Sequence, residues 1–149
     1  MSQLIIPTPG LQIAEMRLSL PILQVFSEFL EFPERKSGLI RLSDDRQIAL
    51  SESSAALIRS ASLEEAVRRK RSDYWYLPDL ESVNQITRQQ LTPDDRNSVL
   101  EFSWRSPSIG GSTWRRYTNQ YRLVSDSYGI IYQVSTSLGF EEIPAPVGV

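Results

Sequence analysis

Cysteine and histidine are both absent from this chain of 149 residues. Without cysteine there is no disulfide, no thiolate ligand for a metal, no thiol nucleophile and no redox switch. Without histidine there is no imidazole general base, no Ser–His pair and no imidazole metal ligand. Zinc chemistry and most hydrolytic catalysis would have to depend on carboxylates alone. We therefore expect a protein that is not an enzyme and holds no metal.

Long apolar runs and an excess of one charge are absent as well. No stretch approaches the roughly 20 apolar residues of a membrane helix, and the N-terminus "MSQLIIPTPG" lacks the basic start and apolar core of a signal peptide. The 16 lysines and arginines against 18 aspartates and glutamates give a net charge of −2, so no overall field favours nucleic acid or an anionic membrane. We expect no nucleic-acid or membrane partner and a cytoplasmic location.

What remains is the composition of an ordinary globular protein. Hydrophobic residues make up 40% of the chain and charged residues 23%, and the length suffices for one domain with a real core. We predict three parts: an N-terminal extension over residues 1–37, a folded domain over residues 38–142, and a proline-containing tail over residues 143–149.

The extension contains an amphipathic helix in "PILQVFSEFLEF", residues 21–32. Proline suits the first helical position, and the apolar residues recur at helical spacing as one stripe. The stripe consists of Ile22, Val25, Phe26, Phe29 and Leu30. A helix this short is not stable alone in water, so the stripe must pack on something. Two interpretations stay open, packing against its own domain or a homodimer interface with a second copy.

A hairpin and several short helices follow in the sequence. "LIRLSDDRQIAL", residues 39–50, reads as two short strands around an aspartate turn. "SESSAALIRSA" predicts a short helix capped by Ser51, and "SLEEAVRRKR" predicts another, with a capping box from Ser62 to Glu65 and a basic end that complements the helix dipole. "LESVNQITRQQL" predicts a further helix with Asp79 as its N-cap.

The last third of the chain changes to an alternating period. "VLEFSWR", "WRRYTNQYRLV" and "GIIYQVSTSL" predict three antiparallel strands with one buried face. In the last two strands we expect the inward residues to be Tyr117, Asn119, Tyr121 and Leu123, then Ile130, Tyr132, Val134, Thr136 and Leu138. With the hairpin, these strands can form one five-stranded antiparallel sheet with the helices over a single face and a cavity between them, an α+β fold.

This order of elements resembles the sensory PAS domain. "LSDDRQIALSESSAALI" is similar to the opening hairpin and first helix of that family, and "SLEEAVRRKRSD" resembles the segment that follows. "TPDDR" is similar to the loop before the later strands, and "YRLVSDSYGIIYQVS" resembles the closing strand pair, with Gly129 near the usual turn glycine. The resemblance covers residues 38–142. It implies a PAS-like five-stranded sheet with short helices on one face and a role in signal transduction. The N-terminal amphipathic helix is an addition to this fold.

The resemblance also bears on the cofactor. Family members with covalent flavin or a coumaroyl pigment need a cysteine, and haem-binding members usually ligate iron through histidine, so this chain departs from all three groups. The cofactor is unknown, and a noncovalent flavin, a small organic acid, a fatty acid or no ligand stay open.

If a pocket exists, we expect the inward sheet face and one aromatic of "SDYWYLPD" to form its wall. The candidate ligand-binding residues are Tyr117, Asn119, Tyr121, Tyr132, Thr136 and Trp75. An unpaired buried amide costs about 1–3 kcal/mol. Asn119 should therefore bond either a neighbouring tyrosine or a ligand.

Three functional hypotheses follow from these observations. The first is a PAS-like sensor that binds a small ligand or a signalling protein, forms a homodimer through the helix at residues 21–32, and regulates an effector outside this chain. The second is a ligand-free interaction and dimerisation module with a filled core. The third is a small cone-shaped α+β enzyme that uses a carboxylate, Asp79 or Asp94, as a base. Burial would raise the pKa of this carboxylate towards neutral pH.

Overall fold

The computed structural model describes residues 19–32, 34–51, 53, 70–107 and 113–148. In chain order the elements are α2 (Leu20–Glu31), β1 (Ser37–Arg41), β2 (Arg46–Leu50), the short 3₁₀ helix η1 (Arg71–Asp73), α5 (Leu77–Gln90), β3 (Leu100–Pro107), β4 (Trp114–Ser125) and β5 (Ile131–Ile143). The helices expected from "SESSAALIRSA" and "SLEEAVRRKR", with the Ser62–Glu65 capping box, lie almost wholly outside the described residues.

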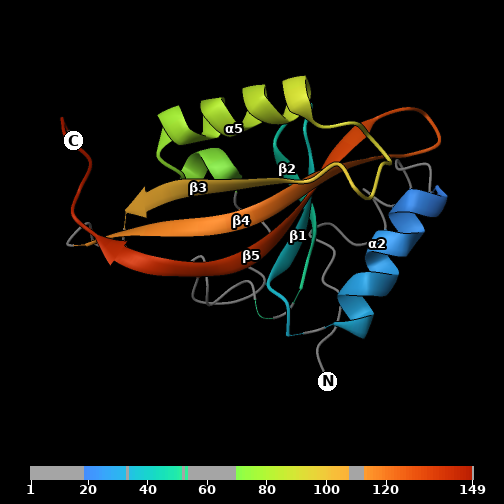
Figure 1. The fold of residues 1–149 in the computed structure, drawn as a ribbon, viewed down its shortest axis with the longest axis horizontal. Coiled ribbons are helices and arrows are strands. Elements are labelled where there is room, and N and C mark those ends of the chain that lie inside the picture. The colour runs from blue at the N-terminus through green and yellow to red at the C-terminus, as the bar shows by residue number, and fades with distance from the viewer. Residues whose placement is uncertain (1–18, 33, 52, 54–69, 108–112, 149) are drawn as a thin grey trace.

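The five strands form one antiparallel sheet in the order β2-β1-β5-β4-β3 (Figure 1). This confirms the α+β fold and the five-stranded sheet expected from the sequence. Three of the four strand pairs join strands that are consecutive in the sequence. The fourth pair, β1 with β5, brings Gly38 opposite Ser135 and so places the first and last strands side by side at the centre of the sheet.

Helix α2 packs against one face of this sheet, which we call the α2 face. Its N-cap is Ser19, whose hydroxyl oxygen accepts a hydrogen bond from the Ile22 amide. Ile22, Val25 and Phe29 are buried in a cluster with Leu39 of β1 and residues of β4 and β5. The apolar stripe of α2 is therefore covered mainly by its own sheet.

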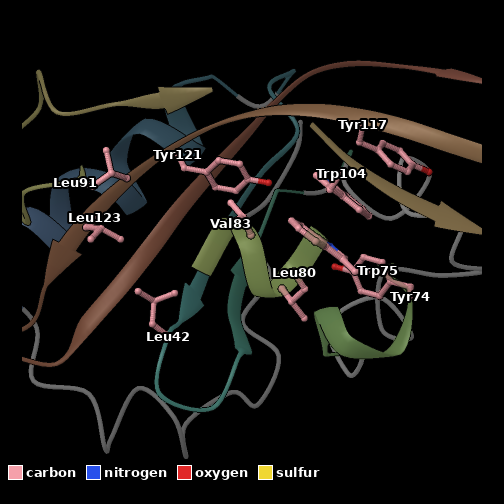
Figure 2. Close-up of a cluster of buried hydrophobic side chains, with 10 residues drawn as sticks. All are labelled: Leu42, Tyr74, Trp75, Leu80, Val83, Leu91, Trp104, Tyr117, Tyr121 and Leu123. Atoms are coloured by element: carbon pink, nitrogen blue, oxygen red, sulfur yellow. The ribbon is translucent and has the colours of Figure 1, made fainter. Parts of the chain in front are cut away.

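Helix α5 packs against the opposite face, the α5 face, where Leu80 and Val83 contact the aromatic residues of β3 and β4 (Figure 2). The helix begins at Leu77 with a proline in its first turn. Its N-cap is Tyr76, so the prediction of Asp79 as the N-cap is wrong. The reason is that the proline starts the helix three residues earlier, which leaves Asp79 inside the first turn with its carboxylate bound to Arg105.

The direction of the β5 side chains also differs from the sequence expectation. The register pairs Leu123 with Gln133, and Val124 with Tyr132. Directly paired residues project to the same face of a sheet, so Gln133 lies on the α5 face and Tyr132 on the α2 face. The same register places Val134 and Thr136, with Tyr132, on the α2 face. Helices cover both faces, so both alternating sets of β5 are partly buried and the alternation alone does not show which set faces α5.

Candidate functional site

Three aromatic rings form a continuous stack on the α5 face (Figure 2). Trp75 lies parallel to Trp104 with ring centroids 4.0 Å apart and an angle of 3° between the planes. Trp104 is stacked in turn on Tyr117 at 4.5 Å and 20°. All three side chains are buried. The stack fills much of the space between the 71–77 segment and strands β3 and β4.

A buried arginine lies beside this stack. Arg71 of η1 is only 2% exposed. Its Nε donates to Asp45 Oδ1 at 2.6 Å, its Nη1 to Gln133 Oε1 at 2.5 Å and its Nη2 to Asn84 Oδ1 at 3.0 Å. A buried charge is tolerated only when it is paired and hydrogen-bonded in this way. Arg71 thereby links the β1–β2 turn, strand β5 and helix α5.

Asn119 is bound within the chain at both ends of its amide. Its Oδ1 accepts from Trp104 Nε1 at 3.1 Å, and its Nδ2 donates to Ser135 Oγ at 2.7 Å. Of the two interpretations of this residue, the internal partner is the one observed, although the partners are a tryptophan and a serine rather than a tyrosine. Asn119 therefore holds the Trp104 ring in the stack.

Several polar atoms in this interior have no partner. Within the described residues, four buried side-chain atoms lack a hydrogen bond: Trp75 Nε1, Tyr121 Oη, Gln133 Nε2 and Asp45 Oδ2. Each such atom costs about 1–3 kcal/mol when it stays unpaired. Burial raises the pKa of the Tyr121 phenol well above its usual value, so this group stays a neutral hydroxyl and a hydrogen-bond donor.

A cavity of about 50 Å³ opens among these groups. Arg71, Trp75 and Asn119 line it together with Gln47 and Ser135. Ligand pockets for drug-sized molecules have about 300–1,000 Å³, so the space bounded by the described residues has no room for a flavin or a haem.

Four of the six predicted ligand-binding residues come together here. Trp75, Tyr117, Asn119 and Tyr121 all lie on the α5 face, and Trp75 and Asn119 line the cavity itself. The other two predicted residues, Tyr132 and Thr136, lie elsewhere.

Tyr132 and Thr136 lie on the α2 face, so the expectation that all six residues share one wall is wrong. The Tyr132 hydroxyl donates to Asp126 Oδ2 at 3.1 Å. Burial, followed by the Asp126 charge, raises the pKa of Tyr132 to about 12. Thr136 lies 3.4 Å from the Ser37 hydroxyl and borders an open groove. The thickness of the sheet separates these two side chains from the cavity.

Sequence reasoning missed Arg71, Gln47, Gln133 and Ser135. Arg71 belongs to the basic run that was expected to complement a helix dipole, and Gln133 and Ser135 are outside the set of β5 residues that was expected to face inward. The alternating pattern of β5 offers two sets of residues that could face inward, and Gln133 and Ser135 belong to the second set. Nothing in the local sequence distinguished that set from the one with Tyr132.

The α2 face carries a different, polar groove of about 680 Å³ between α2 and strands β4 and β5. Glu28 of α2 accepts a hydrogen bond from Arg122 Nη2 at 2.8 Å and also pairs with Arg96. These contacts tie α2 to the sheet and to the segment before β3.

The five residues predicted for a dimer interface have different positions on α2. Ile22, Val25 and Phe29 are buried against the sheet of their own chain, and Phe26 is half-buried beside them. These residues therefore do not present the exposed face that the interface prediction required. Leu30 is 55% exposed, and two further leucines that the prediction did not include, Leu20 and Leu23, are 68% and 48% exposed.

The carboxylates considered as catalytic bases are held by other groups. Both oxygens of Asp79 bind Arg105, at 2.7 and 2.9 Å. Hydrogen bonding to Asp79 raises the pKa of the Arg105 guanidinium. Asp94 lies at the surface, where its carboxylate accepts from the backbone and hydroxyl of Ser125.

The described ranges contain neither a metal-binding cluster nor a membrane-spanning helix. No three histidine, cysteine, aspartate or glutamate side chains lie there in a group that could hold a metal ion. None of the helices there is long and apolar enough to cross a bilayer.

No protein-family model matches the chain, and no curated protein matches it. Among solved structures, the chain is similar to the crystal structure of the PAS domain of an HTR-like protein from Haloarcula marismortui. The two share 14% sequence identity with a TM-score of 0.55, over 81% of this chain and 94% of that one. At this identity the likeness shows the fold. The PAS-like fold implied by the sequence is confirmed.

Proposed function

We propose that this chain is a sensory or signalling module of the PAS type, which binds a ligand or partner and performs no catalysis. The PAS-like fold supports this function, as do the absence of histidine and cysteine from the sequence and the pairing of Asp79 with Arg105. Within this proposal, residues 38–142 are the signalling domain and residues 1–37 an extension that contributes α2. The effector that receives the signal lies outside this chain.

The observation that carries the proposal is the connection from Arg71 through β5 to α2. Gln133 binds Arg71 on the α5 face. Its neighbours Tyr132 and Val134 belong to the cluster that α2 covers on the other face. A shift of β5 caused by a change around Arg71 must therefore alter the surface on which α2 packs, because packed side chains transmit small displacements.

Hydrogen exchange of the α2 amides tests this connection. The variant Gln133→Ala removes the Arg71 contact, and we expect faster exchange in α2 as well as in β5. Gln89→Ala, an exposed position near the end of α5, is the matched control and should leave α2 unchanged. If α2 exchanges equally in both variants and the wild-type chain, the interior is not coupled to this helix and the signalling proposal fails.

We further propose that the module forms a homodimer through the exposed side of α2. The exposed side of α2 has the spacing of a coiled-coil seam, in which a and d positions alternate. These positions are Leu20, Leu23, Ser27 and Leu30. An apolar stripe on one helix can pair with the same stripe of a second copy about a two-fold axis. Dimerisation by these residues replaces the interface first expected at Ile22 and its neighbours.

Light scattering after gel filtration measures the oligomeric state. We expect a dimer for the wild-type chain and a monomer with unchanged circular dichroism for the double variant Leu23→Glu/Leu30→Glu. Leu77→Glu introduces the same charge at another exposed leucine and should leave the dimer intact. A wild-type monomer at high concentration would reject the interface.

A ligand-free interaction module is the second candidate, and the aromatic stack favours it. Trp75, Trp104 and Tyr117 fill the interior where a larger ligand would lie. Native mass spectrometry of protein purified without added ligand distinguishes the two candidates. Extra small-molecule mass supports the sensor, and a bare dimer supports the interaction module.

A further inference from the structure

The cavity on the α5 face has an uneven distribution of charge. Two cations line it, Arg71 and Lys36, and no aspartate or glutamate is among the described residues of its wall. The Asp45 carboxylate binds Arg71 Nε from the β1–β2 turn and is not part of that wall. Because Asp45 already pairs with the Arg71 charge, the wall offers an anion the Lys36 charge and the guanidinium N–H groups that Asp45 does not occupy.

The unpaired polar atoms around the cavity are mainly donors. Trp75 lines it, and its indole Nε1 can only donate a hydrogen bond. Gln133 Nε2, on the residue that binds Arg71, is a second unpaired donor. The guanidinium of Arg71 also has more N–H groups than its bonds to Asp45, Gln133 and Asn84 occupy.

Part of the remaining wall is apolar, beside polar residues such as Gln47 and Ser135, and the space is small. Ile40 and Leu50 contribute hydrocarbon to the lining. The volume of about 50 Å³ is well below the cavity of about 150 Å³ that accepts benzene. A ligand that fits has about four heavy atoms, with acceptor oxygens at one end and a methyl or methylene group at the other.

From these observations we propose that the cavity binds a short-chain carboxylate of the size of acetate. Its two oxygens accept from Trp75 Nε1 and Arg71, and its hydrocarbon end packs against Ile40 and Leu50. Charge-assisted hydrogen bonds of this kind are the strong ones, and they pair donors that are otherwise buried without a partner. The assignment rests on the proposed sensory function for its biological use, because it names the ligand class of that sensor.

The indole N–H signals in a ¹⁵N correlation spectrum provide the test. The chain has 3 tryptophans, and Trp75→Phe identifies the Trp75 signal. On addition of sodium acetate to the whole chain we expect this signal to move downfield with a saturating curve and a Kd in about the millimolar range. The Trp104 indole, already bound to Asn119, should move little. Sodium chloride at the same ionic strength should move neither signal.

Two variants and a longer ligand make the test specific. Trp75→Phe keeps a smaller aromatic ring at this position and removes the N–H donor, so the affinity for acetate should fall by about tenfold. Trp114→Phe, at the far end of β4, should leave the affinity unchanged. Hexanoate should not bind, because the cavity has no room for its chain. Isothermal titration calorimetry measures the affinities of the variant whose indole signal is lost.

Other results would reject the acetate site or the sensory function. If acetate produces no saturable shift beyond that of chloride, the cavity holds only water and the assignment is rejected. If acetate binds but Trp75→Phe binds it equally well, the site lies elsewhere. Acetate binding without any response of α2 in hydrogen exchange would keep the site and reject the sensory function. A response of α2 to Gln133→Ala without acetate binding would reject the acetate site and keep the sensory function.

Discussion

Gln133 and Tyr132 are neighbours in β5, yet each is bound into a different core. The Gln133 Oε1 accepts from Arg71 at 2.5 Å on the α5 face, whereas the Tyr132 hydroxyl donates to Asp126 at 3.1 Å on the α2 face. One peptide unit thus separates the polar interior from the layer under α2. The functional proposals depend on this arrangement, because a ligand beside Arg71 and a partner on α2 act on the same strand.

Replacing Phe29 should unfold the protein rather than dissociate it. Phe29 is buried against the sheet, and Phe→Ala in a core costs about 3–5 kcal/mol of the free energy of unfolding. Gln24→Ala, an exposed position on the same helix, should change it by less than about 0.5 kcal/mol. Urea unfolding followed by circular dichroism compares the two variants. Equal losses of stability would contradict the position of α2.

Removing the Arg71 side chain should destabilise the α5 face strongly. Arg71→Met leaves the Asp45 carboxylate half-buried without its cation, and breaking a buried pair costs about 3–5 kcal/mol. Lys70→Met, one residue earlier and exposed, is the control and should be nearly neutral. The free energy of unfolding in urea measures both. A neutral Arg71→Met would show that the network contributes nothing net.

Asn119→Leu should loosen the aromatic stack. The change leaves the Trp104 Nε1 donor and the Ser135 Oγ acceptor without their observed partner, and an unpaired buried donor such as Trp104 Nε1 costs about 1–3 kcal/mol. Gln120→Leu, the next residue and exposed, introduces the same side chain outside that interior. Near-ultraviolet circular dichroism reports the packing of the tryptophans. An unchanged spectrum for Asn119→Leu would mean that the amide does not position the ring.

The protein should lose stability at alkaline pH, in part through Tyr132. Its pKa is raised to about 12 by burial and the nearby Asp126 charge, above the value of about 10 for an unfolded tyrosine. The folded state therefore keeps a proton that the unfolded state releases, and this contribution is complete below about pH 10 and is lost as the pH rises towards 12.

Thermal unfolding from pH 8 to 11 checks the sign of this dependence. The melting temperature of the wild-type chain should fall above about pH 10. Tyr132→Phe should show a shallower fall, because the titrating group is gone, together with a lower stability at neutral pH from the lost bond to Asp126. Tyr128→Phe, an exposed tyrosine, should keep the wild-type slope. Equal slopes for all three proteins would contradict the prediction.

The sequence by itself determined the local structure of this protein. The hairpin of β1 and β2, the three long strands and the two described α-helices follow from hydrophobic periods and turn residues that act over a few neighbouring positions. The order of these elements was also enough to predict the PAS-like fold. The absence of cysteine and histidine excluded thiol and imidazole chemistry before the structure was considered.

Only the tertiary structure decided which side of β5 faces the interior and what binds Arg71. The strand alternates between two partly buried sets, and the choice between Gln133 and Tyr132 depends on α2 covering the second face of the sheet. Arg71 binds Asp45, Gln133 and Asn84, which lie 26, 62 and 13 positions away in the chain. Contacts between such distant residues arise from the packing of whole elements, which no local pattern of side chains encodes.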